Sequence, residues 1–164
     1  MKFSQLIVLC FVSFLTIPAN AASHLDEFED PVVGLAEGLD VCLSSAAPNN
    51  RSAYNCIGYS ANNCLTRTEN QTTVGMESCN LDELRAWDLL LNRYYQVLRA
   101  DGSFAGLRDI QRAWISYRDL KCDLYDAVYQ GGSIARVLRA DCMRQETARR
   151  VLDLYLFVSE VEGR

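Results

Sequence analysis

The sequence has few of the groups from which enzyme sites are built. Its 164 residues contain a single histidine, His24, which lies in an acidic stretch near the N-terminus. A Ser/His/Asp or Cys/His site would have to use this side chain as its base. No Cys-x-x-Cys and no Glu-x-x-His spacing occurs, which disfavours a thioredoxin-like centre, a zinc site and a di-metal bundle. We therefore expect no catalytic residue, no metal site and no cofactor.

Neighbouring carboxylates are the remaining candidates for acid–base chemistry. Asp82 with Glu83, and Asp123 with Asp126, are pairs of the kind that glycoside hydrolysis requires. They lie, however, where helix starts and solvated helix faces are expected to carry negative charge. We interpret them as surface charges.

The sequence also lacks the alternation of apolar and polar residues that marks β-strands, and it has only three prolines. Apolar residues recur at helical spacing instead. The pattern predicts a loop at 67–75, Ser133 as a helix N-cap, and helices near 32–46, 51–66, 76–100, 104–130 and 133–160. Long helices with short connections favour antiparallel neighbours, so we predict an all-α fold, a small disulfide-linked antiparallel bundle of about five helices.

The N-terminus has the pattern of a secretory signal peptide. Lys2 precedes the apolar run LIVLCFVSFLTI, and small residues up to Ala21 predict cleavage after residue 21. We expect a cleaved signal at 1–21, an acidic mobile leader at 22–31 and one helical domain at 32–164. Without the signal, 15 Lys and Arg stand against 21 Asp and Glu, a net charge of −6 with His24 neutral. This balance disfavours nucleic acid, and we expect a periplasmic or secreted protein with no stable membrane insertion after cleavage.

The cysteines predict disulfide bonds. Cys10 leaves with the signal, and an even number remains in an exported chain, which indicates three bridges. Fifteen pairings are possible. Cys122 and Cys142 lie about ten residues on either side of Gly131-Gly132, so they are predicted to join the last two helices. Reflection about residue 49 suggests Cys42–Cys56, which leaves Cys64–Cys79.

The two helices expected around residue 103 are predicted to fold back on each other. Positions whose numbers add to about 206 then lie opposite, so Asp88 faces Arg118, and Asn92 faces Trp114 with Gln111 one turn away. Two interpretations follow: a polar binding site, or an Asp–Arg pair with an amide pair that fixes helix register. We favour the structural interpretation, which predicts that Arg118→Ala lowers stability because Asp88 loses its partner.

Two further patterns have structural interpretations. The last expected helix interleaves arginines with acidic residues and has Glu146 and Arg150 at ion-pair spacing, which favours a solvated face of mixed charge: Arg136, Arg139, Arg144, Arg149 and Arg150 with Asp141, Glu146 and Asp153. Aromatic residues at helical spacing are more often core than pocket: Tyr94, Tyr95, Trp114, Tyr117, Tyr125 and Tyr129.

An ordered combination of these residues carries a family resemblance. It consists of Asp88-x-x-Leu-Asn92-x-x-Tyr95, Gln111-Arg112-x-Trp114-x-x-x-Arg118-x-x-x-Cys122, then Gly-Gly-Ser, and Cys142 before Thr147. This combination resembles the LprI-type lysozyme-inhibitor domain family of small exported helical proteins, over roughly residues 56–157. The resemblance implies a non-enzymatic bacterial protein that inhibits lysozyme by protein–protein binding, with a c-type lysozyme as the expected partner.

An acidic protein would be steered towards a strongly basic lysozyme, and loops at 67–75 and 101–106 or the acidic leader would supply contacts. The alternative is a periplasmic interaction or structural module that binds another envelope protein and leaves lysozyme untouched. A third reading, a carrier of small ligands, requires an apolar cavity between the helices.

Overall fold

The protein is described by a computed structural model, in which residues 30–46 and 53–163 are placed. The predicted signal, nearly all of the predicted leader and residues 47–52 lie outside these residues. The described α-helices are α1 (Pro31–Ala46), α3 (Tyr59–Leu65), α4 (Thr73–Asp101), α5 (Leu107–Val128) and α6 (Ser133–Glu162), with short 3-10 turns at Tyr54–Cys56 and Thr68–Asn70. No strand occurs in the described residues, so the all-α prediction is confirmed.

Several helix boundaries differ from the sequence prediction. The helix expected near 51–66 is divided, because Gly58 adopts a left-handed conformation (φ 87°) between the 3-10 turn and α3. The helix expected from residue 76 begins at Thr73, where the Thr72 hydroxyl accepts a hydrogen bond from the Gly75 amide at 3.1 Å. Ser133 is the first residue of α6 and not its N-cap, a position that Gly132 occupies without a side-chain hydrogen bond.

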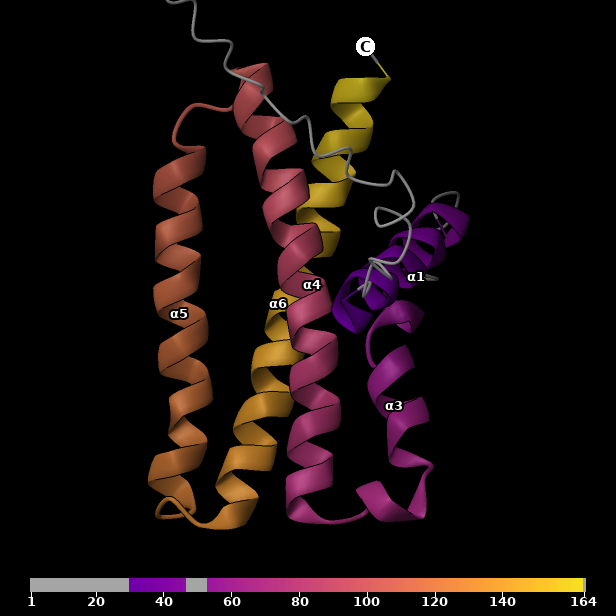
Figure 1. The fold of residues 1–164 in the computed structure, drawn as a ribbon. Helices are drawn as coiled ribbons and strands as arrows, with labels where there is room; N and C mark the ends of the chain where they lie inside the picture. The colour runs from indigo at the N-terminus through magenta and orange to yellow at the C-terminus, as the bar shows by residue number, and fades with distance from the viewer. Residues whose placement is uncertain (1–29, 47–52, 164) are drawn as a thin grey trace, which may run out of the picture.

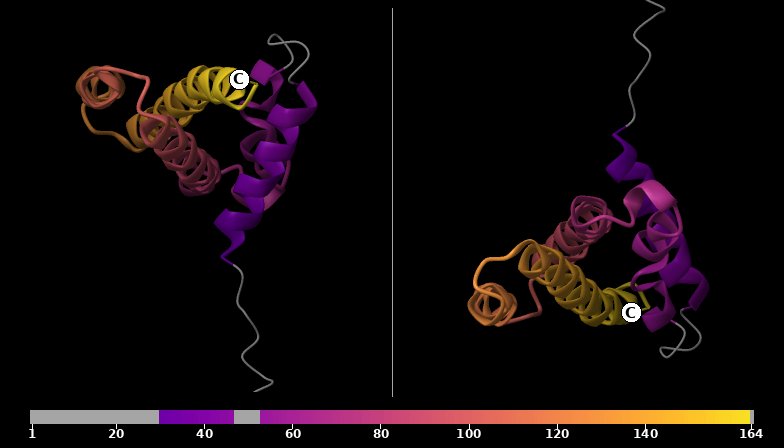
Figure 2. Two further views of the ribbon diagram at one scale, coloured as in Figure 1. Left: turned by 90° about the horizontal axis from the view of Figure 1, so that it is seen from above. Right: turned by 90° about the horizontal axis from the view of Figure 1, so that it is seen from below.

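The hydrophobic core lies between α1, α4 and α6. Figures 1 and 2 show α1 crossing one side of the α4–α6 pair, while α5 stands on the other side at a corner of the molecule. Apolar residues of the three core helices are completely or almost completely buried, among them Leu39, Leu43, Trp87, Leu90, Leu98, Val151 and Leu154. In α5, by contrast, only Gln111 and Cys122 are buried. The bundle is therefore a packed three-helix core with α5 attached to one side.

Disulfides connect the short elements and α5 to this core. The structure joins Cys42 to Cys56, Cys64 to Cys79 and Cys122 to Cys142, with Cα–Cα distances of 6.0, 5.7 and 5.5 Å. These are the three pairs that the sequence suggested. The first links α1 to the following 3-10 turn, the second links α3 to α4, and the third links α5 to α6.

A buried ion pair connects three helices. The carboxylate of Glu83 in α4 is 0% exposed and accepts hydrogen bonds from the amides of Gly58 and Ala61, at 2.7 and 2.6 Å, and from Trp87 Nε1 at 2.9 Å. Arg144 of α6 lies 3.2 Å from the same carboxylate and donates from Nε to Asn80 at 2.9 Å. The interpretation of Glu83 as a surface charge is wrong, because its carboxylate receives the free amides at the start of α3.

We predict that Glu83→Ala destabilises the protein by about 3–5 kcal/mol, because it leaves the buried Arg144 with Asp141 as its one remaining charged partner and leaves two amides at the start of α3 unpaired. Chemical denaturation of the oxidised protein would measure the loss. Arg85→Ala is the control, since its exposed ion pair with Asp82 should contribute less than about 1 kcal/mol. Equal effects of the two substitutions would contradict a central role for Glu83.

Candidate functional site

A surface groove between α4 and α5 gathers the residues of the sequence motif. It has a volume of about 610 Å³. Its lining includes most of the motif residues named from the two helices: Asp88, Asn92, Tyr95, Gln111, Arg112, Trp114 and Arg118. Leu91, Arg108 and Ile115 complete the lining. The fold-back about residue 103 thus brings these side chains to one place, although α5 packs mainly against α6 and borders α4 along this groove.

Arg118 is the anchor at the lower end of the groove. Its guanidinium donates to Asp119 Oδ1 at 3.0 Å and to Thr147 Oγ1 at 3.2 Å, and lies 3.8 Å from Asp88 Oδ1. It also stacks over the Trp114 ring, 5.0 Å from the centroid. With its side chain only 13% exposed, Arg118 connects α5 to both α4 and α6.

The contact with Arg118 stabilises the ionised Asp88 carboxylate less than the sequence suggested. Its side chain is 44% exposed. Partial burial raises the pKa of the Asp88 carboxyl above its usual value, and the opposing attraction of Arg118 does not cancel this effect. The folded state therefore holds the Asp88 proton more tightly than the unfolded chain does, and the ionised carboxylate does not stabilise the fold through its own charge.

The expected amide pair between α4 and α5 is not formed. Gln111 is buried, and its side-chain oxygen accepts a hydrogen bond from Arg150 Nε of α6 at 3.0 Å. Asn92 is exposed and Tyr95 half-buried, and neither has a hydrogen-bonding side-chain partner among the described residues. The amide-pair interpretation is wrong because the Gln111 side chain turns to α6. The groove consequently presents free polar groups from α4.

The groove continues towards the loop between α4 and α5. A second hollow of about 480 Å³ shares Tyr95 and Arg108 with the first and is also lined by Arg99, Phe104 and Leu107. The upper rim is rich in arginine. Arg108 lies 3.5 Å from Asp109 with both side chains well exposed, and Arg112 has no ionic partner in the described part of the chain. The groove thus carries exposed positive charge in a protein that is acidic overall.

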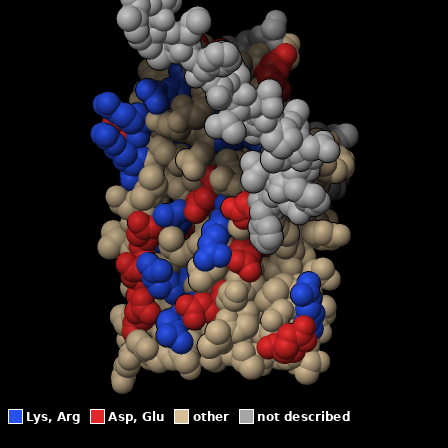
Figure 3. Space-filling view, in the orientation of Figure 1, with Lys and Arg blue, Asp and Glu red and all other residues tan. Residues whose placement is uncertain are grey.

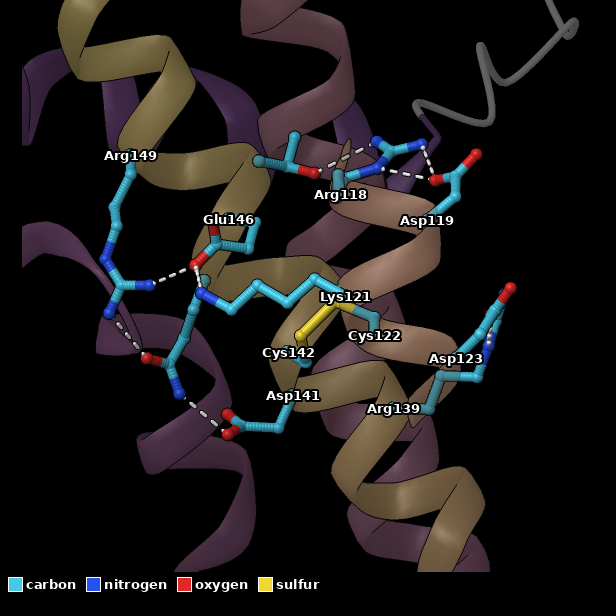
Figure 4. The surroundings of a disulfide bond; sticks show 12 residues. Arg118, Asp119, Lys121, Cys122, Asp123, Arg139, Asp141, Cys142, Glu146 and Arg149 are labelled. Carbon is cyan, nitrogen blue, oxygen red and sulfur yellow. Dashed lines mark hydrogen bonds and ion pairs between the residues drawn. A yellow bond between two sulfur atoms is a disulfide. The ribbon is translucent and has the colours of Figure 1, made fainter. Parts of the chain in front are cut away.

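The surroundings of the Cys122–Cys142 disulfide are strongly ionic (Figure 4). Glu146 of α6 accepts from Lys121 Nζ at 2.9 Å and also pairs with Arg149. Burial alone would raise the pKa of Glu146, but hydrogen bonds and charge attraction from Lys121 and Arg149 outweigh it and lower that pKa below its ordinary value of 4.5. The carboxylate therefore stabilises the attachment of α5 while it is ionised.

The prediction of a solvated mixed-charge face on α6 is only partly right. Arg136 and Arg139 pair with acidic side chains near the surface, and Figure 3 shows basic and acidic side chains interleaved on the face that Figure 1 presents. Arg144 and Glu146, however, are buried. The expected Glu146–Arg150 contact is replaced, because Glu146 binds Lys121 and Arg149 while Arg150 binds Gln111 and lies 3.9 Å from Asp153.

The tyrosines also divide between the core and the surface. Tyr94 is buried and donates a short hydrogen bond to Asp40 of α1, which together with burial raises the pKa of the Tyr94 hydroxyl. Tyr117 and Tyr129 of α5 are exposed. The core interpretation is right for Tyr94 and wrong for these two, because helical spacing does not show which side of α5 the core covers.

The described residues contain no cluster of His, Cys, Asp and Glu that would hold a metal ion. None of the described helices combines the length and apolar character that crossing a membrane requires. Three disulfides are typical of a protein outside the cytoplasm. His24 lies outside the described residues.

Comparisons with known proteins give two matches. A protein-family model described as "Lysozyme inhibitor LprI" matches residues 64–154, a range that includes α4, α5 and most of α6. The chain is also similar to a protein of Rhizobium meliloti (strain 1021) called "Uncharacterized protein R02472", with 31% identity over 101 residues, 52% of this chain and 73% of the relative. No solved structure matches.

We predict that Arg118→Ala lowers the free energy of unfolding by about 1–3 kcal/mol, because Arg118 loses its contacts with Asp119, Thr147 and Trp114 together. Asp88→Asn should cause no loss at pH 7, since it removes a carboxylate that burial disfavours. Urea unfolding of both variants separates the two roles. If Asp88→Asn cost as much as Arg118→Ala, the ion pair itself would be the source of the stability.

We further predict that Glu146→Gln destabilises the protein by about 1 kcal/mol at pH 7, where the half-exposed partners Lys121 and Arg149 limit the effect. A lowered pKa means that this contribution is present above pH 4.5 and is lost as the pH falls through the folded-state value. The difference from the unchanged protein should therefore shrink in acid. Glu37→Gln, on the exposed side of α1, is the control and should change the free energy of unfolding at pH 7 by much less than Glu146→Gln does.

Proposed function

The chain belongs to the LprI lysozyme inhibitor family, and from this membership we propose that it binds a lysozyme and inhibits it. The observation that carries the proposal is the family match over residues 64–154, which includes both walls of the α4–α5 groove. A c-type lysozyme is the expected target. The cleaved signal and export to the periplasm or the medium belong to the same proposal.

We propose the α4–α5 groove as the contact surface for the enzyme. It brings together side chains that are exposed and do not serve the fold. Asn92 and Arg112 have no partner among the described residues, whereas Arg118 and Gln111 are held by contacts to α6. An interface needs polar groups that remain free to pair with a partner. Asn92 and Arg112 meet this requirement, and Arg118 and Gln111 keep the wall on which they stand in place.

The charge of the groove rim suits an enzyme whose chemistry depends on carboxylates. Lysozyme cleaves its substrate with two carboxyl groups that flank the glycosidic bond. A guanidinium inserted between them would pair with them and exclude the polysaccharide. Arg112, with Arg108 beside it, is the candidate for this contact. The net negative charge of the chain would act at longer range by steering it towards a basic enzyme.

We predict that the purified, oxidised protein inhibits lysis of bacterial cell walls by a c-type lysozyme with a stoichiometric endpoint. Arg112→Glu should weaken inhibition by roughly 100-fold, because it reverses a contact charge inside the groove. Arg85→Glu is the matched control: this exposed residue of α4 lines neither hollow, and the substitution changes the net charge by the same amount.

Comparison of the two variants separates direct contact in the groove from long-range electrostatic steering. Equal losses would mean that only the overall charge matters and that the groove is not the binding surface. No inhibition by the unchanged protein at large molar excess would reject the lysozyme proposal and favour a module that binds another envelope protein.

A further inference from the structure

The outward face of α5 carries an apolar stripe that no other described element covers. Leu120 and Leu124 are 72% and 61% exposed, and Ile110, Tyr117 and Val128 are also more than half exposed. The opposite face of the same helix is tied to the core through Gln111, Arg118 and Cys122, with Leu107 and Trp114 as partly buried apolar contacts. An amphipathic helix ordinarily turns its apolar side inwards. Helix α5 instead leaves a continuous apolar stripe exposed.

The stripe has the spacing of a helix–helix seam. Exposed apolar residues follow each other at alternating steps of three and four, namely Ile110, Ala113, Tyr117, Leu120, Leu124 and Ala127. This is the heptad repeat of positions that pack between two helices of a coiled coil. The repeat runs for about 26 Å along a straight helix at 1.5 Å per residue. Figure 2 shows α5 at a corner of the molecule, so its outer side is accessible to another helix.

We propose that α5 packs antiparallel against α5 of a second copy of this chain, about a two-fold axis that passes between residues 118 and 119. In this register Ile110 meets the partner's Ala127, Ala113 meets the partner's Leu124, and Tyr117 meets the partner's Leu120. Each alanine lies opposite a large side chain, which fills the seam evenly. A parallel arrangement would place alanine against alanine at two levels and leave gaps there.

The size of the stripe is appropriate for a dimer. The exposed parts of the five large side chains, from Ile110 to Val128, amount to roughly 600 Å² per copy, near the 800 Å² that each partner buries in a standard interface. A single exposed patch of this size is at the upper limit for a monomer. Among charged neighbours, Asp123 would lie beside Ser116 of the other copy, so the register brings no like charges together.

A second copy explains the stripe better than the lysozyme partner does. The seam is self-complementary under a two-fold rotation, a property that only an identical partner uses. The α4–α5 groove opens on another side of α5, and neither Leu120 nor Leu124 lines it. Dimerisation is therefore independent of the proposed inhibition, and each is testable without the other.

We predict that the oxidised protein sediments as a dimer at micromolar concentration. Leu124→Glu should raise the dimer dissociation constant by roughly 100-fold, because the carboxylate is buried against the partner's Ala113 without a counter-charge. Val74→Glu, at an equally exposed apolar position on α4, is the control and should leave the constant unchanged. Both substituted positions are exposed, so thermal unfolding should show that the variants keep their fold.

The double variant Ala113→Lys with Leu124→Glu tests the register. In the antiparallel dimer each new lysine faces a new glutamate, so association should recover at least tenfold relative to Leu124→Glu alone. A parallel pair would set like charges together and weaken further, which would overturn the proposed arrangement. A monomer at all concentrations, or equal effects of Leu124→Glu and Val74→Glu, would overturn the dimer. Loss of lysozyme inhibition by Leu124→Glu, when the unchanged protein is itself a monomer, would overturn the dimer and assign the stripe to the enzyme.

Discussion

The buried contact between Glu83 and Arg144 is the constraint on which the rest of the fold depends. One carboxylate receives two backbone amides at the start of α3, the indole of Trp87 and the guanidinium of Arg144. A buried charge is tolerated only when its hydrogen-bonding capacity is used, and here Oε1 accepts from Gly58, Trp87 and Arg144 while Oε2 accepts from Ala61. The pair therefore fixes α3, α4 and α6 relative to one another.

A rigid core of this kind allows α5 to be held from one side only. Helix α5 is attached through the Cys122–Cys142 bridge, through Arg118 and Gln111, and through the contact of Lys121 with Glu146. Because these attachments are local and specific, the helix does not need a large apolar interface with α4. Space remains between the two helices for a groove, and the apolar side of α5 remains exposed.

The sequence predicts the parts of this arrangement that follow from short connections between neighbouring elements. Reflection about residues 49 and 131 suffices for Cys42–Cys56 and Cys122–Cys142, and reflection about residue 103 suffices for the approach of Asp88 to Arg118, because short connections favour antiparallel neighbours. It fails for Glu83 and Arg144, which are 61 positions apart and look like ordinary surface charges on their own helices. Their burial is decided by where the start of α3 lies. The interpretation of Tyr117 as a core residue fails for a different reason. Periodicity identifies a helix face without showing what covers that face.

The two proposed surfaces use different sides of one helix, and this has a consequence for how they act together. An antiparallel α5 pair would place the two grooves on opposite flanks of the seam, because the two-fold axis relates them. Lysozyme works on a cell wall, where many enzyme molecules bind a continuous substrate, and a bivalent inhibitor gains from a high effective concentration at the second site. The contacts of Arg118 to Asp119 and Thr147 would then serve both surfaces, since they set the rotation of α5 about its axis. A helix held from one side by a few strong contacts is thus a simple means of presenting a groove and a seam at once.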